Sequence, residues 1–387
     1  MANSSQRHSA QNPRNINIEL LRIFAMVLVV LCHAVIHLDV GNSQFRMELA
    51  VVPGWKNAIR FTAVQYGQVG VSIFFMISGF FLSSKTFSWR RVFLTWSQAF
   101  LYTTLCFFSI LIYQRFSPLP AFLAPLMQGS ELKRTALWSF FPFLYDSYWF
   151  IDAYIVMLLF VPFINLVMRY STKRQLIALI ALLAFLGTWP LFFNQTNHWN
   201  NVTYAIICYL IGGFIHQELS RVRETRPLVL SALIATSTIA MTLFNYIAAS
   251  RSSVITALGW PALVKQGLQV LPILIASCLL IAALKMAPRS KETTANTVIR
   301  AVAKSTFGVY LLHENIFGFR ILWTAVARFM PHPSGLIESA ILLIIIVIAV
   351  FLLLDGMAFL LDSLLIHPCQ KLAFAAIDRH KALTHQE

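Results

Sequence analysis

The chain has 387 residues, of which 58% are hydrophobic and only 12% are charged, and its mean hydropathy is +0.69. This composition excludes a soluble globular domain or a disordered chain and indicates an all-α integral membrane protein. The net charge of +15 does not call for a nucleic-acid partner, because basic loops on one side of a membrane account for it. The five cysteines show no C-x-x-C spacing, so the sequence supports neither a disulfide framework nor a thiolate metal site.

Apolar segments of membrane-spanning length follow a polar head. The first of them has no small-residue cleavage site, so it is predicted to stay in the protein as a membrane helix. Length and flanking charge predict about ten spans. In chain order these are Ile16–Leu38, Gly67–Ser83, Val92–Tyr113, Tyr148–Met168, Gln175–Phe193, Val202–His216, Leu228–Ala249, Gly267–Met286, Thr306–Val326 and Leu336–Leu365.

The distribution of basic residues predicts the topology. Every loop on the side of the amino terminus is basic, so both termini are expected in the cytoplasm. The chain then divides into a cytoplasmic tail (1–15), a ten-helix membrane domain (16–365) and a second cytoplasmic tail (366–387), which is an interfacial helix at most. The longest connection, 114–147, is partly apolar and is expected to re-enter the membrane or lie on its outer surface.

Two polar residues share one face of the first predicted helix. Arg22 and His33 are eleven residues apart, which places them about 20° apart around the helix and roughly 16 Å apart along it. Both are costly inside a membrane, where such residues usually mark a functional pathway. The pair therefore indicates a site that binds an anionic group near one face and carries out proton chemistry deep inside. Glu19, one turn before Arg22, is a natural partner for its charge.

The imidazole of His33 is the candidate reactive group. A buried imidazole tends to stay neutral, so it can accept a proton as a general base, or it can receive an acyl group itself. His37 follows one turn later, but no third ligand accompanies this His-x-x-x-His pair, and no metal site is predicted. Gly79 and Gly308 indicate close approach between helices.

Four motifs in order resemble the membrane acyltransferase-3 family. They are Arg22 with His33, the segment 71–82 (VSIFFMISGFFL) with its following basic run, the segment 149–154 (WFIDAY) leading to Pro162, and the segment 305–313 (STFGVYLLH). The resemblance extends from residue 16 to about 365. Two positions depart from it: Glu19 stands where the family commonly has Asp, and Leu158 stands where many members have Tyr.

The resemblance implies an enzyme that takes an acyl group, commonly acetyl, from cytoplasmic acyl-CoA to a hydroxyl of a cell-surface carbohydrate. No tightly bound cofactor is expected, and acyl-CoA is a co-substrate. On this interpretation His33, Glu19 and His313 are the candidate catalytic residues. Arg22, Lys85, Arg90 and Arg91 form a cationic mouth for the phosphates of the donor, because arginine binds phosphate bidentately.

The outer end of the protein is predicted to bind the acceptor. Trp149, Asp152 and Tyr154 sit at the outer end of the fourth span, and Glu314 adjoins His313 in the ninth. His313 could orient the acceptor, stabilise a developing oxyanion or make a polar packing contact. Aromatic residues at this depth are usually interfacial, whereas a carboxylate beside them also suits sugar hydroxyls.

Two functions of different classes fit the sequence. The first is an O-acyltransferase of a bacterial cytoplasmic membrane, most simply an O-acetyltransferase of polysaccharide biosynthesis. The alternative is a proton-coupled transporter that uses Arg22, His33, His313 and Glu314 as a polar relay. Transporters often show inverted repeats and interrupted helices, and no convincing halves occur here. We therefore expect the enzyme.

Overall fold

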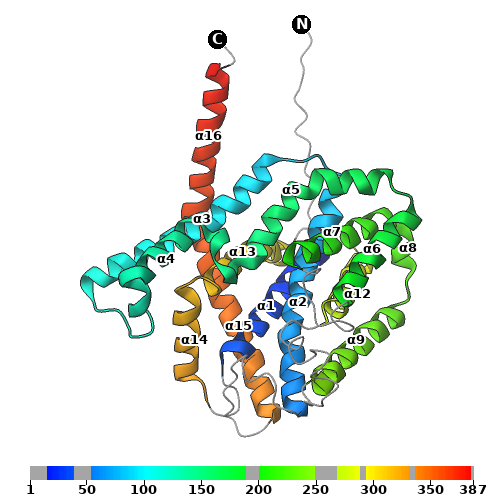
Figure 1. Ribbon diagram of the computed structural model, residues 1–387, viewed down its shortest axis with the longest axis horizontal. Coiled ribbons are helices and arrows are strands. Elements are labelled where there is room, and N and C mark those ends of the chain that lie inside the picture. Colours follow the sequence, from blue (N-terminus) through cyan, green and yellow to red (C-terminus); the bar gives the residue numbers. More distant parts are fainter. Residues whose placement is uncertain are drawn as a thin grey trace.

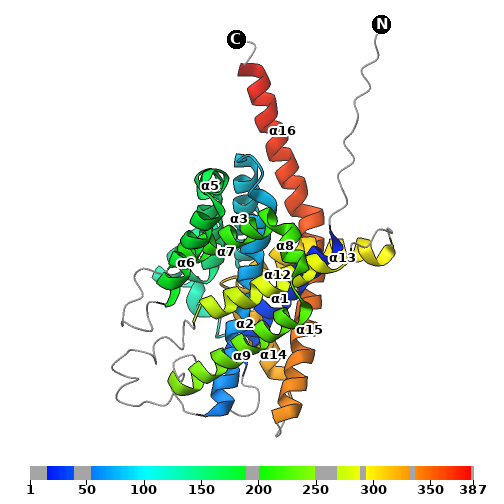
Figure 2. The same cartoon turned by 90° about the vertical axis from the view of Figure 1, so that its right-hand side faces the viewer.

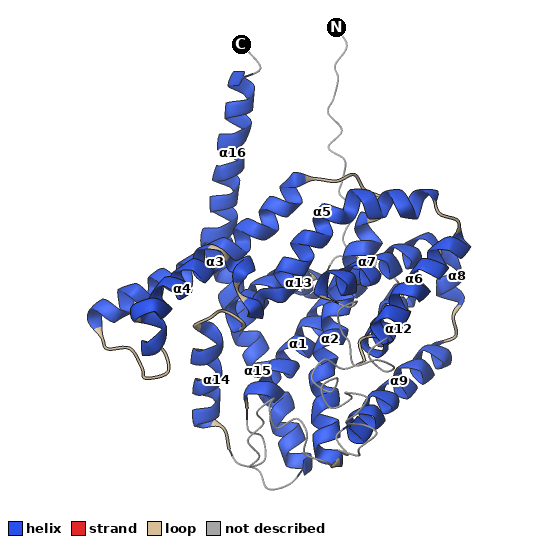
Figure 3. Cartoon of the chain, in the orientation of Figure 1, coloured by secondary structure: helices blue, strands red, loops and turns tan. Residues whose placement is uncertain are grey.

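The computed structural model describes residues 15–38, 54–188, 200–248, 268–287, 293–331 and 336–384. All regular elements in these ranges are helices (Figure 3). Almost all of the predicted tail 1–15, and the predicted span ends at 189–193, 249 and 267, lie outside them. The α-helices are α1 (Ile16–His37), α2 (Trp55–Leu82), α3 (Trp89–Phe116), α4 (Gly129–Phe140), α5 (Trp149–Tyr170), α6 (Lys173–Thr188), α7 (Asn201–Gln217), α8 (Leu219–Glu224), α9 (Pro227–Ala248), α12 (Val270–Lys285), α13 (Thr294–His313), α14 (Gly318–Phe329), α15 (Leu336–Leu361) and α16 (His367–Thr384). Short 3₁₀ turns cover Ala124–Met127, Pro142–Leu144 and Asp146–Tyr148, and a π-helical turn covers Asp362–Ile366.

Helix α2 lies at the centre of the bundle and packs against α1, α7, α9 and α12 (Figure 1). Two glycines bring α2 and α7 into backbone contact, as the sequence predicts for the first of them. A Cβ at Gly79 would lie 2.0 Å from the Tyr209 carbonyl oxygen, and one at Gly212 would lie 2.0 Å from that of Met76. Gly308 likewise lets α13 approach α3 and α15, since a Cβ there would lie 2.4 Å from the Tyr102 hydroxyl oxygen. These contacts fix the helices that carry the site.

Six helical segments in the described ranges are long and apolar enough to cross a membrane, which fits a multi-pass membrane protein. They are α1, α2, α3, α5 with its preceding turn, α9, and the rod of α15 and α16. Helices α6, α7 and α12 have only 16 or 17 residues, or roughly 25 Å. Helix α13 is longer but carries Arg300 and Lys304. The predicted fold class, an all-helical membrane protein, is therefore supported, whereas the number of about ten spans stays a prediction.

The predicted ninth span, Thr306–Val326, is wrong as a single helix. Helix α13 ends at His313, and α14 begins at Gly318. The Asn315 side chain causes the break, because its Oδ1 accepts hydrogen bonds from the backbone N–H groups of Phe317 (3.0 Å) and Gly318 (3.4 Å). An asparagine that binds the backbone ahead of it favours a turn over a continuing helix. The predicted second span is also too short, since α2 begins at Trp55 and not at Gly67.

Several helices have their basic ends on the same face of the bundle. Side chains near the ends of α1, α5, α7 and α8 donate hydrogen bonds to carbonyl groups near the ends of neighbouring helices. These bonds are Asn17 Nδ2 to Met286 O (3.0 Å), Asn165 Nδ2 to Leu82 O (2.9 Å), Gln217 Nε2 to Met168 O (3.2 Å) and Arg223 Nε to Leu284 O (3.3 Å). The face formed by these ends is called the basic face below.

The connection 114–147 is largely helical. Helix α4 runs back along α3, and the Thr103 hydroxyl donates to the Ser139 carbonyl at 2.6 Å. The two helices project together from the side of the body (Figure 1). The predicted tail 366–387 is also more regular than expected. A π-helical turn joins α15 to α16, which extends beyond the rest of the bundle (Figure 2).

Candidate active site at His33

His33 of α1 meets His313 at the end of α13. Its Nδ1 lies 2.9 Å from His313 Nε2, so the two imidazoles occupy the same depth. His313 is completely buried, whereas the side chain of His33 keeps 18% of its exposure. The helix break at Asn315 follows His313 directly and brings Glu314 back beside His33.

Hydrogen bonding fixes the tautomers of the neutral imidazoles. The Val309 carbonyl lies 2.7 Å from His313 Nδ1, and a carbonyl only accepts, so this nitrogen carries the proton. His313 Nε2 is then the acceptor, and His33 Nδ1 must donate to it. The remaining nitrogen of His33, Nε2, keeps its lone pair. The hydrogen bonds therefore orient the His33 ring so that its Nε2 can accept a proton.

Glu314 faces this free nitrogen. Its Oε1 lies 3.4 Å from His33 Nε2 and makes no hydrogen bond. A carboxylate at this distance can stabilise positive charge that develops on the ring, and the effect is strong because water is largely excluded. The arrangement follows the logic of a catalytic triad, in which one group fixes the tautomer of a histidine and a charge stabilises its protonated form.

Within the described ranges, His33, His313 and Glu314 also form a cluster of side chains that could hold a metal ion. The ligand atoms of His33, His313 and Glu314 lie within 4.8 Å of one another. However, His313 Nδ1 binds the Val309 carbonyl and its Nε2 accepts from His33. A metal would have to replace the bond between the two histidines, so the geometry fits a proton-transfer site better.

His37 takes no part in this cluster. Its ring stacks on Phe319 (5.5 Å between centroids) and Trp323 (5.8 Å), both on α14. The centroids of the His33 and His37 rings are 6.3 Å apart. The His-x-x-x-His spacing of α1 therefore places His37 against aromatic rings one turn beyond the cluster.

A cavity of about 520 Å³ opens on the side of Arg22 and is called the inner cavity below. Arg22 is held by Glu19, whose two carboxylate oxygens lie 3.1 and 3.0 Å from its Nη1. Glu19 is 3% exposed and lies roughly 21 Å along α1 from His33. The structure thus places Glu19 as the partner of Arg22 and not beside the imidazole of His33.

Two residues that the sequence analysis did not select also line the inner cavity, namely Lys304 of α13 and His367 of α16. Lys304 had a sequence signal, since a cation precedes His313 on α13 as Arg22 precedes His33 on α1. His367 had none, because its segment was predicted to be a tail. Three nitrogen-bearing side chains from three helices thus surround one cavity.

The other three predicted donor-binding residues lie outside its lining. Arg91 donates to the Thr86 carbonyl (3.1 Å), and its own carbonyl accepts from the hydroxyl of Thr95, which lines the cavity. Arg91 is therefore about one helical turn further toward the basic face. Arg90 lies over the ring of Phe374 on α16, and Lys85 is exposed in the turn after α2.

A second cavity, of about 560 Å³, holds Trp149 and Asp152 and is called the outer cavity below. Its remaining lining is polar and aromatic, consisting of Gln68, Phe143, Tyr145, Asp146, Asn200, Asn201, Tyr204 and Gln269. Carboxylate and amide side chains offer both acceptors and donors, and Trp149 offers a flat ring. These are the groups that bind a polyhydroxylated ligand.

Tyr154 does not join Trp149 and Asp152, contrary to the sequence-based grouping. It lines the inner cavity, and the Ser78 hydroxyl donates to its hydroxyl at 3.3 Å. The reason is helical geometry, because five residues after Trp149 the side chain has turned by about 140° and lies roughly 7.5 Å deeper. Asp152, three residues after Trp149, stays within about 60° of it.

Aromatic side chains connect the two cavities to the histidine pair. Phe150 lines the inner cavity and contacts Tyr310 (5.5 Å between centroids), which in turn contacts His313 (5.9 Å). Tyr145 lines the outer cavity and contacts Tyr148 (5.5 Å between centroids), which contacts the same Tyr310 (5.8 Å). The cluster of His33, His313 and Glu314 is thus linked to a cationic cavity on one side and a polar cavity on the other.

The fold and the site define a multi-pass membrane protein with a partly buried, oriented imidazole between two chemically different cavities. A comparison with known protein families matches residues 15–355 to the family described as "Acyltransferase domain" (Acyl_transf_3). The chain therefore belongs to the acyltransferase-3 family and is a membrane acyltransferase, which implies an acyl donor and, in general, a carbohydrate acceptor. No curated protein and no solved structure matched the chain.

Proposed function

We propose that the protein is an acyl-CoA-dependent O-acyltransferase that acylates a hydroxyl of an extracytoplasmic or lipid-linked carbohydrate with His33 as the general base. The observation that carries this proposal is the free Nε2 of His33, which the bond to His313 orients toward Glu314. A carrier that performs no chemistry has no need of an imidazole fixed in one tautomer. Membership of an acyltransferase family also favours the enzyme.

The chemistry at His33 balances without a further reactant. The acceptor hydroxyl loses its proton to His33 Nε2 as its oxygen attacks the thioester carbonyl. The resulting tetrahedral intermediate collapses, the carbon–sulfur bond breaks, and the ester forms. The CoA thiolate then takes the proton from the imidazolium, which returns His33 to its starting state. Glu314 stabilises the imidazolium during the interval, and His313 keeps its ring in place.

The inner cavity suits the donor. Acyl-CoA carries phosphates and a base at one end and a thioester at the end of a long flexible arm. Arg22, Lys304 and His367 supply donors for phosphate oxygens, and the cavity also contains aromatic rings. Arg22 and His33 are roughly 16 Å apart along α1, a distance that a flexible arm can cover. The acyl group we propose is acetyl, the group that the resemblance to the family most commonly implies.

The outer cavity suits the acceptor. Asp146, Asp152, Asn200 and Asn201 can bind sugar hydroxyls, and Trp149 can stack on a sugar ring. We place the basic face in the cytoplasm of a bacterial cell, where acyl-CoA is made, and the outer cavity on the opposite side of the cytoplasmic membrane. The acyl group then crosses the bilayer within the protein, whereas CoA stays on the cytoplasmic side.

The test is mass analysis of surface polysaccharide from cells with and without this protein, together with cells that carry His33→Ala. We expect an acyl ester only where the wild-type protein is present. Ester content that stays the same in all three strains would contradict the proposed function. Membrane levels of the variant, measured by immunoblot, control for expression.

A further inference from the structure

Helix α16 lies beyond the residues that match the family, yet it reaches the inner cavity. The family match ends at residue 355, whereas α16 begins at His367. His367 lines the inner cavity together with Arg22 and Lys304. The helix then leaves the bundle on the side of the start of α3 (Figures 1 and 2).

A local distortion fixes the position of His367. Its backbone N–H bonds to the Asp362 carbonyl, five residues earlier, which is the π-helical pattern. The next residue, Pro368, has no N–H to continue the normal ladder, so the sequence itself explains the wider turn. The Asp362 carboxylate accepts from Tyr102 (2.9 Å) and Gln98 (3.0 Å), which anchors this turn to α3.

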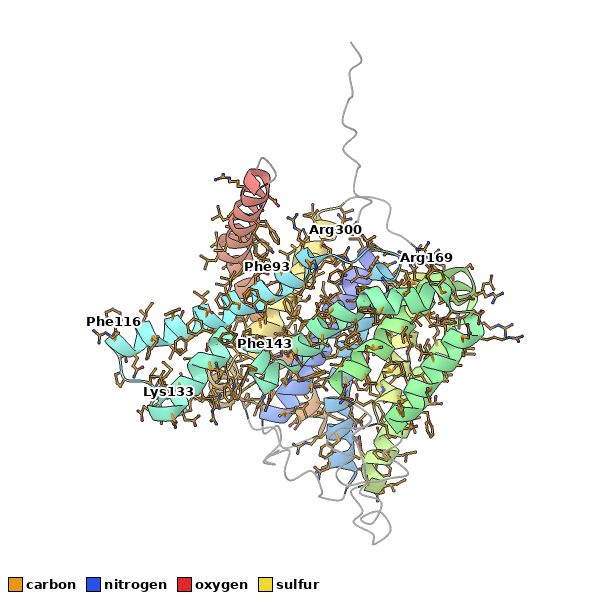
Figure 4. The ribbon with its side chains drawn as sticks, turned by 45° about the horizontal axis from the view of Figure 1, so that its top comes forward. Phe93, Phe116, Lys133, Phe143, Arg169 and Arg300 are labelled. Atoms are coloured by element: carbon orange, nitrogen blue, oxygen red, sulfur yellow. The ribbon has the colours of Figure 1, made fainter. Side chains whose placement is uncertain are left out.

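Further along, α16 packs on the start of α3. The Gln370 amide donates to the Ser97 hydroxyl (2.9 Å), and the Phe374 ring lies 5.1 Å from that of Phe93. Phe93 lies beside the base of α16 in Figure 4. The guanidinium of Arg90 lies 4.5 Å above the Phe374 ring. Such a contact orients the cation while its N–H groups stay available to a ligand.

We propose that α16 is the outer wall of the donor site, in which His367 contacts a phosphate of the CoA nucleotide and Phe374 positions Arg90 for a second phosphate contact. This inference rests on the proposed function, because it assumes an acyl-CoA donor. It explains why the cation of Arg90 is held near the cavity without lining it. It also explains why His367 lines the cavity although it lies outside the matched family domain. The two observations share one cause, since the same helix carries His367 and Phe374.

The experiment compares two donors on the full-length protein in lipid nanodiscs. Acetyl-CoA carries the nucleotide phosphates, whereas S-acetylpantetheine has the same thioester and arm without them. His367→Ala and Phe374→Ala should each raise the Kd of acetyl-CoA about tenfold, the effect of losing a charge-assisted contact. Neither should change binding of S-acetylpantetheine. Leu372→Ala, at a position on α16 that is 72% exposed, is the matched control and should change neither.

The outcomes separate this inference from the proposed function. If wild-type protein binds neither donor, the proposed function fails. If wild-type protein binds acetyl-CoA and the two variants bind it equally well, only the role of α16 is overturned. An equal loss for both donors would also overturn it, because that result indicates a general change of structure.

A second measurement needs no variant. Hydrogen–deuterium exchange of the wild-type protein should slow at 367–377 on addition of saturating CoA, since the phosphates would hold α16 against α3. S-Acetylpantetheine should leave this exchange unchanged. Exchange that is the same with and without CoA would overturn the proposal even if the variants fail to fold.

Discussion

At the scale of single residues, the site consists of one imidazole with two neighbours that act on different atoms. His313 accepts from Nδ1 of His33, and Glu314 faces its Nε2. The first contact decides where the proton of the neutral ring lies, and the second stabilises the charge of the protonated ring. Because these effects are separable, the neighbours give different phenotypes.

His313→Ala removes the acceptor for His33 Nδ1–H, so the ring loses its fixed tautomer, and the turnover rate should fall at least about tenfold. His313→Gln, which can restore an acceptor, should recover part of this loss. Glu314→Gln should lower the rate as well but leave the tautomer intact. Single-turnover acyl transfer with saturating acyl-CoA measures these rates. A turnover rate of His313→Ala equal to that of the wild type would refute the positioning role.

The two cavities should respond to different substitutions. Arg22→Ala should weaken acyl-CoA binding about tenfold or more, and Arg22→Lys should restore it only in part, because lysine cannot make a bidentate phosphate contact. Asp152→Asn should raise the KM for the acceptor and leave donor binding unchanged. Calorimetry with acyl-CoA across this panel is the measurement.

A control is needed because Glu19 is buried and loses its partner in Arg22→Ala. The double variant Glu19→Gln/Arg22→Ala removes the unpaired charge and should still bind the donor weakly. If Asp152→Asn loses acyl-CoA binding while the Arg22 variants keep it, the assignment of the two cavities is reversed.

The sequence supports the Arg22–His33 axis because both residues lie on one continuous helix, where spacing determines the shared face. It could not show that Glu314 faces His33, since that depends on the turn made by the buried Asn315, nor that His367 reaches the inner cavity, since that depends on a π-helical turn. The sequence groups Tyr154 with Trp149 and Asp152 because they are close along the chain, whereas its helical phase turns it into the lining of the inner cavity.

At the scale of elements, the contact between α2 and α7 holds the bundle together around the site. The two helices approach so closely at Gly79 and Gly212 that a Cβ on either would meet a carbonyl oxygen of the other helix. Backbone cannot move aside as a flexible side chain can. This contact is therefore a sensitive packing feature of the described helices.

Gly79→Ala should destabilise the protein by about 1–3 kcal/mol or more, because the added methyl group forces α2 and α7 apart. Gly356→Ala is the matched control. Gly356 also lies within a helix, but a Cβ there has no neighbour within 4 Å, so the substitution should be neutral or slightly stabilising. Thermal unfolding in detergent, followed by fluorescence, compares the two. Equal melting temperatures would show that the helices are not tightly apposed.

At the scale of the whole molecule, the basic face and the outer cavity give the protein a direction. Hydrogen bonds gather the ends of α2, α5, α7 and α12 on the basic face, near the start of α1. The outer cavity is lined by the start of α5 and the start of α7, which lie at the opposite ends of those helices. The proposed reaction therefore runs from one side of the membrane to the other.

Cys369 provides a native probe of this direction. It is exposed on α16, whereas the other four cysteines are partly or fully buried. A membrane-impermeant maleimide should label it in inverted membrane vesicles and not in intact cells. Cys369→Ala should abolish the labelling. Efficient labelling of Cys369 in intact cells would place α16 outside and reverse the proposed topology.

Acyl transfer across a sealed membrane is the decisive experiment for the proposed function. Proteoliposomes are prepared with a hydroxyl-bearing glycan extract inside, and radiolabelled acetyl-CoA is added outside to the population whose Cys369 faces outward. We expect label in the enclosed glycan with the wild-type protein. With His33→Ala the labelling rate should fall by about 10²-fold or more, while the binding of acyl-CoA stays unchanged. Label that enters the glycan at more than about a tenth of the wild-type rate in His33→Ala would contradict the role of His33.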